Sequence, residues 1–298
     1  MALLLIIDKP GQLCNQLWSY LNMVAIAKVT NSRMILLIED DLFKYFDCYP
    51  SKGTLVFKPD SYYFKFIKYI SRFFEFSFEK SSFKEILIFK PLNHDSHNSY
   101  HELYKKIKSG RAYFVNSWDF RRFTDVNLMQ DSEIKSFFRF KRNLSLSVDK
   151  SFNDKSQSKA TLVGVHIRRG DYNNFQNGKF YFDHTIYAGY MYEFLKKSQF
   201  ELVQFFISSN EDIPTQVFKD FNWFNLSNSS GPEDLYGLSK CVYIIGPPST
   251  FNMWSAYYGN SNLFVIDSPS KPLSIDKFRK VYAQDIFDDK TNYSNKTN

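Results

Sequence analysis

The chain has 298 residues, of which 44% are hydrophobic and 23% charged, a composition that suits a globular protein with a substantial core. Its net charge of +7 suits an anionic ligand, a nucleic acid or a membrane surface, although the basic residues form short groups and no continuous tract. Three cysteines without CxxC spacing support neither a disulfide framework nor a structural zinc site. Because we find no secretory signal and no run of about 18 apolar residues, we expect a cytosolic protein, or one bound peripherally to the inner face of a membrane.

The first part of the chain predicts a βαβ unit. The expected strand, helix and strand lie at residues 3–7, 15–29 and 34–38. Pro10-Gly11 forms the turn between the first two, and this order implies a parallel sheet. Residues 40–110 show no clear period, while residues 112–115 resemble a short strand and residues 131–140 a helix.

The second part repeats the alternation of strands and helices. Residues 145–159 are rich in Ser, Asp, Lys and Asn, and we interpret them as a linker. The expected strands are residues 161–167, 204–208, 242–245 and 263–266, and the expected helices are residues 185–197, 214–221, 233–240 and 251–258. The predicted domains are residues 1–150 and 160–287, followed by a disordered polar tail at 288–298.

The strand at 161–167 runs into a dense group of charges, His166-Ile167-Arg168-Arg169-Gly170-Asp171-Tyr172. Strand alternation places His166 and Arg168 on one face and Arg169 on the other. Two arginines and a histidine at the end of a strand can grip phosphate oxygens. A solvated, salt-bridged strand end is the alternative interpretation.

Three other strand ends lead into helices with polar residues. Asn15 can cap the first helix, whose unpaired N–H groups favour an anion. Glu211 or Asp212 can accept hydrogen bonds from guanine, or can serve as ordinary acids near a helix N-terminus. Ser249 and Thr250 place two hydroxyls at a helix N-terminus, which suits a diphosphate or plain capping.

Taken in chain order, these segments resemble the motifs of glycosyltransferase family 11, the α-1,2-fucosyltransferases. His166 to Tyr172 looks like the HxRRGDY signature, and Gly11 to Trp18 resembles the GGLGNQMFQY opening. Ser209-Asn210-Glu211 resembles the family's SDD block and Asp234 to Cys241 its DLxLMSxC block. Ser249 to Ala256 resembles its STFSWWAAW block. The departures from the family pattern are Pro10, Cys14, Asn210, Glu211 and Asn252. Residues 40–140, where such enzymes usually hold the acceptor, match none of these motifs.

The resemblance implies a GT-B fold, in which two Rossmann-like lobes face each other across a cleft. The N-terminal lobe would serve the acceptor and the C-terminal lobe the nucleotide sugar. It implies inverting transfer of fucose from GDP-fucose to a glycan hydroxyl, with α-1,2 as the expected linkage and with no metal ion and no cofactor. The lack of a DxD motif and of clustered His or Cys residues agrees with this.

Several alternatives remain open at this stage. The same scaffold could form another linkage such as α-1,6, use another acceptor such as a protein, or take another donor sugar. A carbohydrate-binding protein without turnover is the alternative from another class. We expect no nucleic-acid partner, because basic residues and aromatics do not interleave in a defined module.

The resemblance also suggests roles for individual residues. Without Mg²⁺, the negative charge that develops on the β-phosphate must be met by fixed cations and dipoles, and Arg168 is the first candidate. Asp171 either orients Arg168, which we favour, or acts as the general base, while His166 positions phosphate or ribose or is simply a core residue. Arg169 is expected to pair with a carboxylate. The expected donor-binding residues are Asn15, Gln16, Glu211, Ser249, Thr250 and Phe251.

Overall fold

The structure, a computed structural model, describes residues 1–38, 40–50, 53–79, 89–92, 100–109, 112–120 and 126–282. The chain divides into two compact units, Met1–Lys141 and Arg142–Asn298. The tail expected at 288–298 lies outside the described residues. No described helix combines the length and the apolar character needed to cross a membrane.

The linker predicted at 145–159 is wrong, because helix α7 (Arg142–Lys155) occupies most of that segment. Val148 and Phe152, four residues apart on one helix face, are both buried. The Phe152 ring packs against Phe206 and Phe224 at centroid distances of 4.9 and 5.1 Å. These apolar contacts make α7 part of the second unit.

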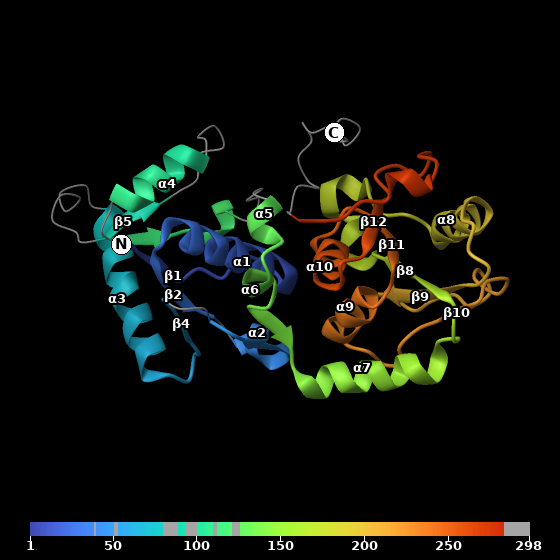
Figure 1. Ribbon diagram of the computed structural model, residues 1–298, viewed down its shortest axis with the longest axis horizontal. Helices are drawn as coiled ribbons and strands as arrows, with labels where there is room; N and C mark the ends of the chain where they lie inside the picture. Colours follow the sequence, from blue (N-terminus) through green and yellow to red (C-terminus); the bar gives the residue numbers. More distant parts are fainter. Residues whose placement is uncertain are drawn as a thin grey trace. The chain divides into compact units, whose positions relative to one another are not determined.

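The first unit contains a five-stranded parallel sheet in the order β4-β2-β1-β6-β5 (Figure 1). Its strands are β1 (Leu3–Ile6), β2 (Arg33–Leu37), β4 (Thr54–Phe57), β5 (Phe89–Leu92) and β6 (Ala112–Val115). The longer helices are α1 (Leu13–Thr30), α3 (Tyr62–Glu79) and α4 (Tyr100–Ser109), and the shorter ones are α2 (Asp40–Tyr45), α5 (Val126–Met129) and α6 (Ser132–Lys135). The predicted βαβ unit and the strand at 112–115 are confirmed.

A small antiparallel sheet closes the first unit. Strand β3 (Phe46–Cys48) pairs with β7 (Phe138–Phe140), and the rings of Phe46 and Phe140 lie 4.4 Å apart. The helix predicted over 131–140 is therefore wrong in its second half. Alternation explains the difference, because Phe138 and Phe140 are buried while Arg139 between them is exposed.

The second unit repeats the architecture with a parallel sheet in the order β10-β9-β8-β11-β12. Its strands are β8 (Thr161–Ile167), β9 (Val203–Ser209), β10 (Trp223–Phe224), β11 (Tyr243–Gly246) and β12 (Asn262–Val265). Its longer helices after α7 are α8 (His184–Lys197), α9 (Gly231–Ser239) and α10 (Thr250–Gly259). In both units the first strand is central and the order reverses beside it, as in doubly wound Rossmann-like sheets.

The helix predicted at 214–221 is also wrong. Val217, Phe218 and Phe221 each donate a backbone hydrogen bond only three residues back, so the segment forms a series of turns. Phe218 is fully buried and contacts Trp223, while the Phe221 ring packs edge-on against Phe205. Packing both rings over so short a connection to β10 favours turns over a helix.

Close packing between α9 and α10 leads to a stability prediction. A Cβ on Gly259 would overlap the backbone carbonyl of Ser239, whereas a Cβ on Gly189 in α8 would meet nothing within 4 Å. Gly259→Ala should lower the free energy of unfolding by about 3 kcal/mol, since overpacked backbone must move. The matched control Gly189→Ala should raise it by about 0.5 to 1 kcal/mol, because alanine is the better helix former. Urea denaturation of both variants measures this, and equal effects would contradict the packing argument.

Candidate functional site

The predicted site residues of the second unit lie where the strand order of its sheet reverses. His166 and Ile167 end β8, and Gly246 ends the neighbouring β11. Helix α10 starts four residues after Gly246, behind Pro247, Pro248 and the N-cap Ser249. Doubly wound sheets bind ligands at this position, outside the carboxyl ends of the strands.

A pocket of about 440 Å³ opens at the ends of β8 and β9. Its walls come from both strands and from the loops that lead into α9 and α10. The lining residues are His166, Arg168, Ile207, Ser208, Ser209, Asn210, Glu211, Asp212, Ile213, Asn225, Leu226, Asn228, Ser229, Gly231, Asp234 and Phe251. The volume lies within the range of small-molecule and cofactor sites.

His166 forms part of the inner wall of this pocket. Its side chain is buried, and its ring stacks on Phe251 with centroids 4.8 Å apart and an interplanar angle of 26°. Burial, helped by the nearby positive charge of Arg168, lowers the pKa of His166 to about 3. The imidazole is therefore neutral near pH 7. Its Nδ1 is buried and has no hydrogen-bond partner within the described residues.

Arg168 lies on the same wall and is held from one side. Its Nη2 donates a hydrogen bond of 2.7 Å to Asp171 Oδ2, and its guanidinium lies 5.6 Å from the centre of the Tyr172 ring. Its Nε is buried, with no hydrogen-bond partner in the described part of the chain. The Tyr172 hydroxyl donates to the Pro248 carbonyl at 2.6 Å, which ties this turn to the loop before α10. The contact with Asp171 is the orienting contact that we favoured from the sequence.

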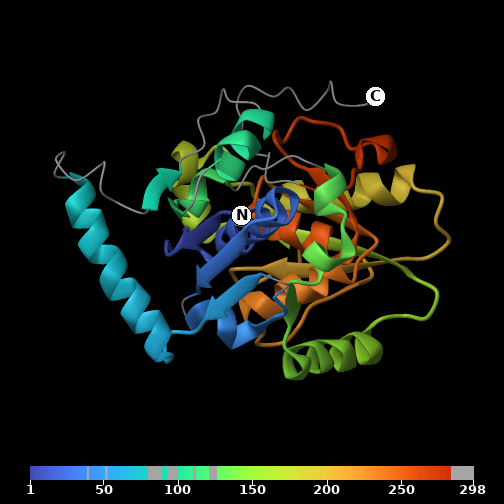
Figure 2. The ribbon, with the colours of Figure 1, turned by 60° about the vertical axis from the view of Figure 1, so that its left-hand side comes forward.

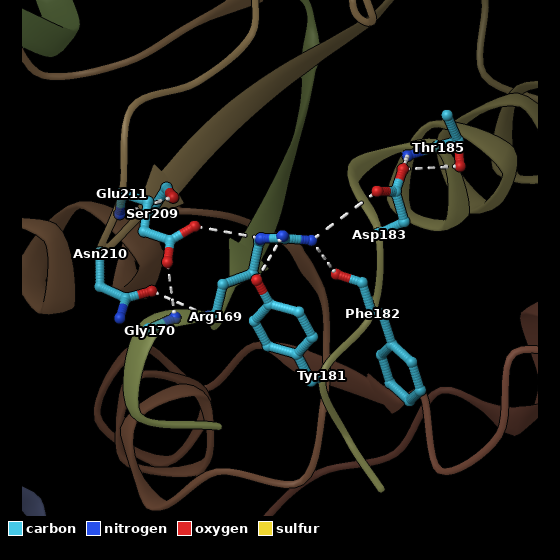
Figure 3. A network of polar contacts seen from close by, with 9 residues as sticks. All are labelled: Arg169, Gly170, Tyr181, Phe182, Asp183, Thr185, Ser209, Asn210 and Glu211. Carbon is cyan, nitrogen blue, oxygen red and sulfur yellow. Dashed lines mark hydrogen bonds and ion pairs between the residues drawn. The ribbon is translucent and has the colours of Figure 1, made fainter. Parts of the chain in front are cut away.

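Arg169 does not line the pocket, and each nitrogen of its guanidinium donates a hydrogen bond to a neighbouring residue (Figure 3). Its Nη1 donates to the Phe182 carbonyl at 2.8 Å, its Nη2 to the Tyr181 hydroxyl at 2.5 Å, and its Nε to Glu211 Oε2 at 3.1 Å. The predicted pairing of Arg169 with a carboxylate is thus confirmed: the closer partner is Glu211, and Asp183 forms a longer ion pair at 3.9 Å. We call these residues, with Gly170 and Asn210, the Arg169 network.

The turn after β8 requires glycine at position 170. Gly170 has φ +43°, and a Cβ there would come within 2.6 Å of Asn210 Nδ2. Its N–H donates to Glu211 Oε1 at 2.8 Å, and the Arg169 N–H donates to Asn210 Oδ1 at 2.9 Å. The Gly170 hydrogen bond is the largest cause that lowers the pKa of Glu211, followed by the Arg169 side chain. Glu211 is therefore anchored through both carboxylate oxygens while it lines the pocket.

The residues before α10 divide between the pocket and the helix. Ser249 is the N-cap of α10, and its hydroxyl accepts a hydrogen bond of 3.2 Å from the Phe251 N–H, as the capping interpretation predicts. Phe251 lines the pocket, whereas Ser249 and Thr250 are not among its lining residues. Their role in diphosphate binding stays a prediction.

Asn15 and Gln16 belong to the first unit. Helix α1 begins at Leu13 with Gln12 as its N-cap, so the prediction that Asn15 caps this helix is wrong. Gln16 is buried, and its Nε2 donates to the Gly11 carbonyl at 3.1 Å, which braces the turn before the helix. The donor-binding role of both residues stays a prediction.

Asp234 is a pocket residue to which the sequence analysis gave no role. Its carboxylate accepts hydrogen bonds from Ser208 at 3.0 Å and from Ser229 at 2.7 Å, and burial raises its pKa to about 6. Asp234 lies within the segment that resembles DLxLMSxC, directly after the capping-box residue Glu233. The resemblance of this segment to DLxLMSxC could have indicated Asp234 as a candidate. Its burial could not be predicted from the sequence, because the burial depends on strand β9.

Comparison with solved structures identifies the class of fold. The fucosyltransferase NodZ from Bradyrhizobium is similar with a TM-score of 0.56 and 14% identity, over 91% of this chain and 97% of that one. NodZ alpha-1,6-fucosyltransferase soaked with GDP-fucose gives a TM-score of 0.52 and 14% identity, over 87% and 93%. POFUT1 in complex with GDP-fucose gives a TM-score of 0.50 and 10% identity, over 87% of this chain and 94% of that one. The fold is of the GT-B type, built from two Rossmann-like units, as predicted.

The sequence itself defines the family. Residues 93–294 match glycosyl transferase family 11, and the chain belongs to this family. It is therefore a glycosyltransferase. No curated protein matches the sequence.

The raised pKa of Asp234 predicts a pH dependence of stability. Between about pH 4 and pH 6 the folded protein retains a proton that the unfolded chain releases, so this carboxyl stabilises the fold at low pH. The contribution is lost as the pH rises through about 6. Asp234→Asn should therefore gain stability relative to the parent protein, by up to about 3 kcal/mol, as the pH rises from about 4 to about 7.

Urea denaturation across this pH range measures the difference between the two proteins. Asp154→Asn, which changes an exposed carboxyl of α7, is the matched control and should follow the parent protein. Parallel curves for the parent protein and Asp234→Asn would contradict the raised pKa.

Proposed function

We propose that the protein transfers fucose from GDP-fucose to a hydroxyl of a glycan acceptor, with inversion at the anomeric carbon and without a metal ion. Family membership supports glycosyl transfer. Two of the similar structures contain GDP-fucose, which supports this donor. We keep the α-1,2 linkage as the expected product, on the resemblance of His166 to Tyr172 to the HxRRGDY signature.

The observation that carries the proposal is the different state of the two neighbouring arginines. Arg169 uses its guanidinium within the network that joins β8 to β9. Arg168 instead faces the pocket, oriented by Asp171 and with its buried Nε unpartnered in the described residues. A cation held in this way is prepared for an anionic ligand and needs little rearrangement when it binds.

Arg168 would act on the leaving group. When the bond between the anomeric carbon and the β-phosphate oxygen breaks, negative charge grows on that oxygen. A guanidinium that is already positioned stabilises this charge more in the transition state than in the bound donor, and this difference lowers the barrier. Asp171 would hold Arg168 in place. The neutral His166, stacked on Phe251, would offer a flat wall without adding charge.

Glu211 would recognise the guanine. The N1–H and the exocyclic amine of guanine present two parallel donors, which match the two oxygens of a carboxylate. Glu211 lies on the pocket wall with each oxygen fixed by one protein donor, and each oxygen keeps a second lone pair for the base. Asp234, buried on the same wall between two serines, is the competing candidate for this role.

Metal independence is part of the proposal and has a direct test. Within the described ranges, no group of three or more His, Cys, Asp or Glu side chains could hold a metal ion. We expect turnover to survive EDTA and dialysis, and GDP to raise the melting temperature equally with and without Mg²⁺. UDP should raise it much less. Loss of turnover on chelation, restored by Mg²⁺, would contradict this part of the proposal.

Replacement of Arg168 tests the assignment of the leaving-group cation. Arg168→Ala should lower kcat by about 10²- to 10³-fold, because one preorganised donor to the developing charge is removed. The fold and most of the thermal shift with GDP should remain. Arg142→Ala, at an exposed arginine that begins α7, is the matched control and should keep full activity. Unchanged turnover and donor hydrolysis in Arg168→Ala would overturn the mechanism.

A comparison of GDP with IDP tests base recognition. IDP lacks the exocyclic amine, so the parent protein should bind GDP more tightly, by about tenfold or more. Glu211→Gln should lose most of this preference, and Asp234→Asn should keep it. Calorimetric titration of the three proteins with both nucleotides measures the ratio. If only Asp234→Asn loses the preference, the role belongs to Asp234.

The linkage and the acceptor follow from a product analysis. A panel of glycan acceptors incubated with GDP-fucose should give a fucosylated product, and NMR should assign its linkage as α-1,2. A different linkage would correct the proposed product and leave the donor assignment intact.

A further inference from the structure

Helix α3 carries aromatic side chains on its outward face. Tyr62, Phe66 and Tyr69, at helix positions i, i+4 and i+7, are 75%, 49% and 76% exposed. Phe64, on the opposite side of the helix, is 5% exposed and anchors it to the first unit. A surface helix usually presents polar residues to solvent, so this pattern is reversed. Figures 1 and 2 show α3 at the edge of the first unit.

The exposed rings form one continuous surface. The rings of Tyr62 and Phe66 stack at 6.1 Å with an interplanar angle of 11°, and Tyr63, 61% exposed, meets Tyr62 edge-on at 6.2 Å. We call Tyr62, Tyr63, Phe66 and Tyr69 the α3 aromatic face. Single exposed apolar residues need no explanation, but a contiguous group marks an interaction surface.

Tyrosines dominate the α3 aromatic face. A tyrosine ring is apolar along its body and polar at its hydroxyl, so it suits a boundary between hydrocarbon and water. Tyrosine and tryptophan accumulate at the level of lipid headgroups for this reason. A helix that lies in the plane of a membrane surface combines such rings with basic side chains at its flanks.

The charge around the α3 aromatic face is positive. Lys65 is exposed beside the rings and Lys68 follows one turn later, with its Nζ 5.2 Å from the centre of the Phe64 ring. Lys58, before the helix, is exposed as well. The first turn of α3 contains no acidic residue, and Asp60 is the one acid between positions 58 and 69 of the sequence. This charge complements an anionic surface.

We propose that the α3 aromatic face binds an anionic lipid surface, with the helix lying parallel to the membrane. The rings enter the headgroup region, while Lys65 extends to the lipid phosphates along its flexible stem. A second copy of the chain is a poorer occupant. In a twofold contact this surface would meet a second copy of itself, and the two surfaces carry charge of the same sign. The inference is independent of the proposed reaction.

Vesicle binding tests the proposal with the full-length protein. The parent protein should sediment with vesicles of phosphatidylcholine and phosphatidylglycerol in equal parts, and much less with phosphatidylcholine alone. The triple variant Tyr62→Ser/Phe66→Ser/Tyr69→Ser should bind the mixed vesicles about tenfold or more weakly, since it loses the apolar contacts. Lys65→Glu should weaken binding to the mixed vesicles alone, and added salt should reduce the difference between the two vesicle types.

Matched controls separate this surface from other exposed rings. Tyr192→Ser/Leu195→Ser removes two exposed apolar side chains of α8, at 63% and 41% exposure, and should bind vesicles like the parent protein. All variants should keep the parent melting temperature and the thermal shift with GDP, since the pocket lies in the second unit. Tyr69→Trp adds a probe whose fluorescence should shift to the blue on mixed vesicles.

Three results would overturn the proposal. One is equal vesicle binding by the parent protein, the triple variant and Lys65→Glu. Another is an unshifted Tyr69→Trp emission on vesicles that the protein does bind, which would place the contact elsewhere. The third is a lipid-free dimer in size-exclusion chromatography that the triple variant abolishes, which would make the surface an interface between copies. Should the triple variant fail to fold, Lys65→Glu and Tyr69→Trp still decide the question.

Discussion

The Arg169 network is the constraint on which the candidate site depends. A largely buried guanidinium just after β8 must find acceptors, because leaving a desolvated charge unpaired is costly. Arg169 finds them on the loop after β9, through Glu211, and on the segment before α8, through Tyr181 and Phe182. These contacts hold the ends of β8 and β9 together. Adjacent residues of an extended chain point to opposite faces. The contacts that fix Arg169 therefore also direct Arg168 into the pocket.

The pocket concentrates its positive charge in one place. Among its lining residues, Arg168 is the only arginine or lysine, and burial keeps His166 neutral near pH 7. Two of its carboxylates are restrained as well, because Glu211 is held by Arg169 and Gly170, and Asp234 by two serines. The pocket therefore presents a single arginine to a ligand, and Asp171 fixes the position of this cation. Such an arrangement gives the ligand a direction as well as a binding energy.

The sequence predicts the parts of this structure that local rules determine. Alternation and turn residues give the central strands, the parallel sheets and the opposite orientations of Arg168 and Arg169. Local rules fail where burial depends on distant partners. The polar composition of 145–159 favours a linker, although the segment contains Val148 and Phe152. These two residues form the buried face of a helix because β9 and β10 supply the rings that cover Phe152. For the same reason, the sequence does not predict the burial of Asp234, whose serine partner Ser208 lies on β9.

The pairing of β3 with β7 has a consequence for how this protein can change. It joins Phe46–Cys48 to Phe138–Phe140, so the sequence between them starts and returns at one fixed point just before α7. The stretch between them contains β4, β5 and β6 of the parallel sheet, so insertions or deletions are tolerated in the connections between these strands, which can change without moving the two ends of the stretch. Closing a longer loop adds only a small entropic cost. The connection between β4 and β5, which carries α3, can therefore be remodelled while the pocket of the second unit keeps its own strands and helices.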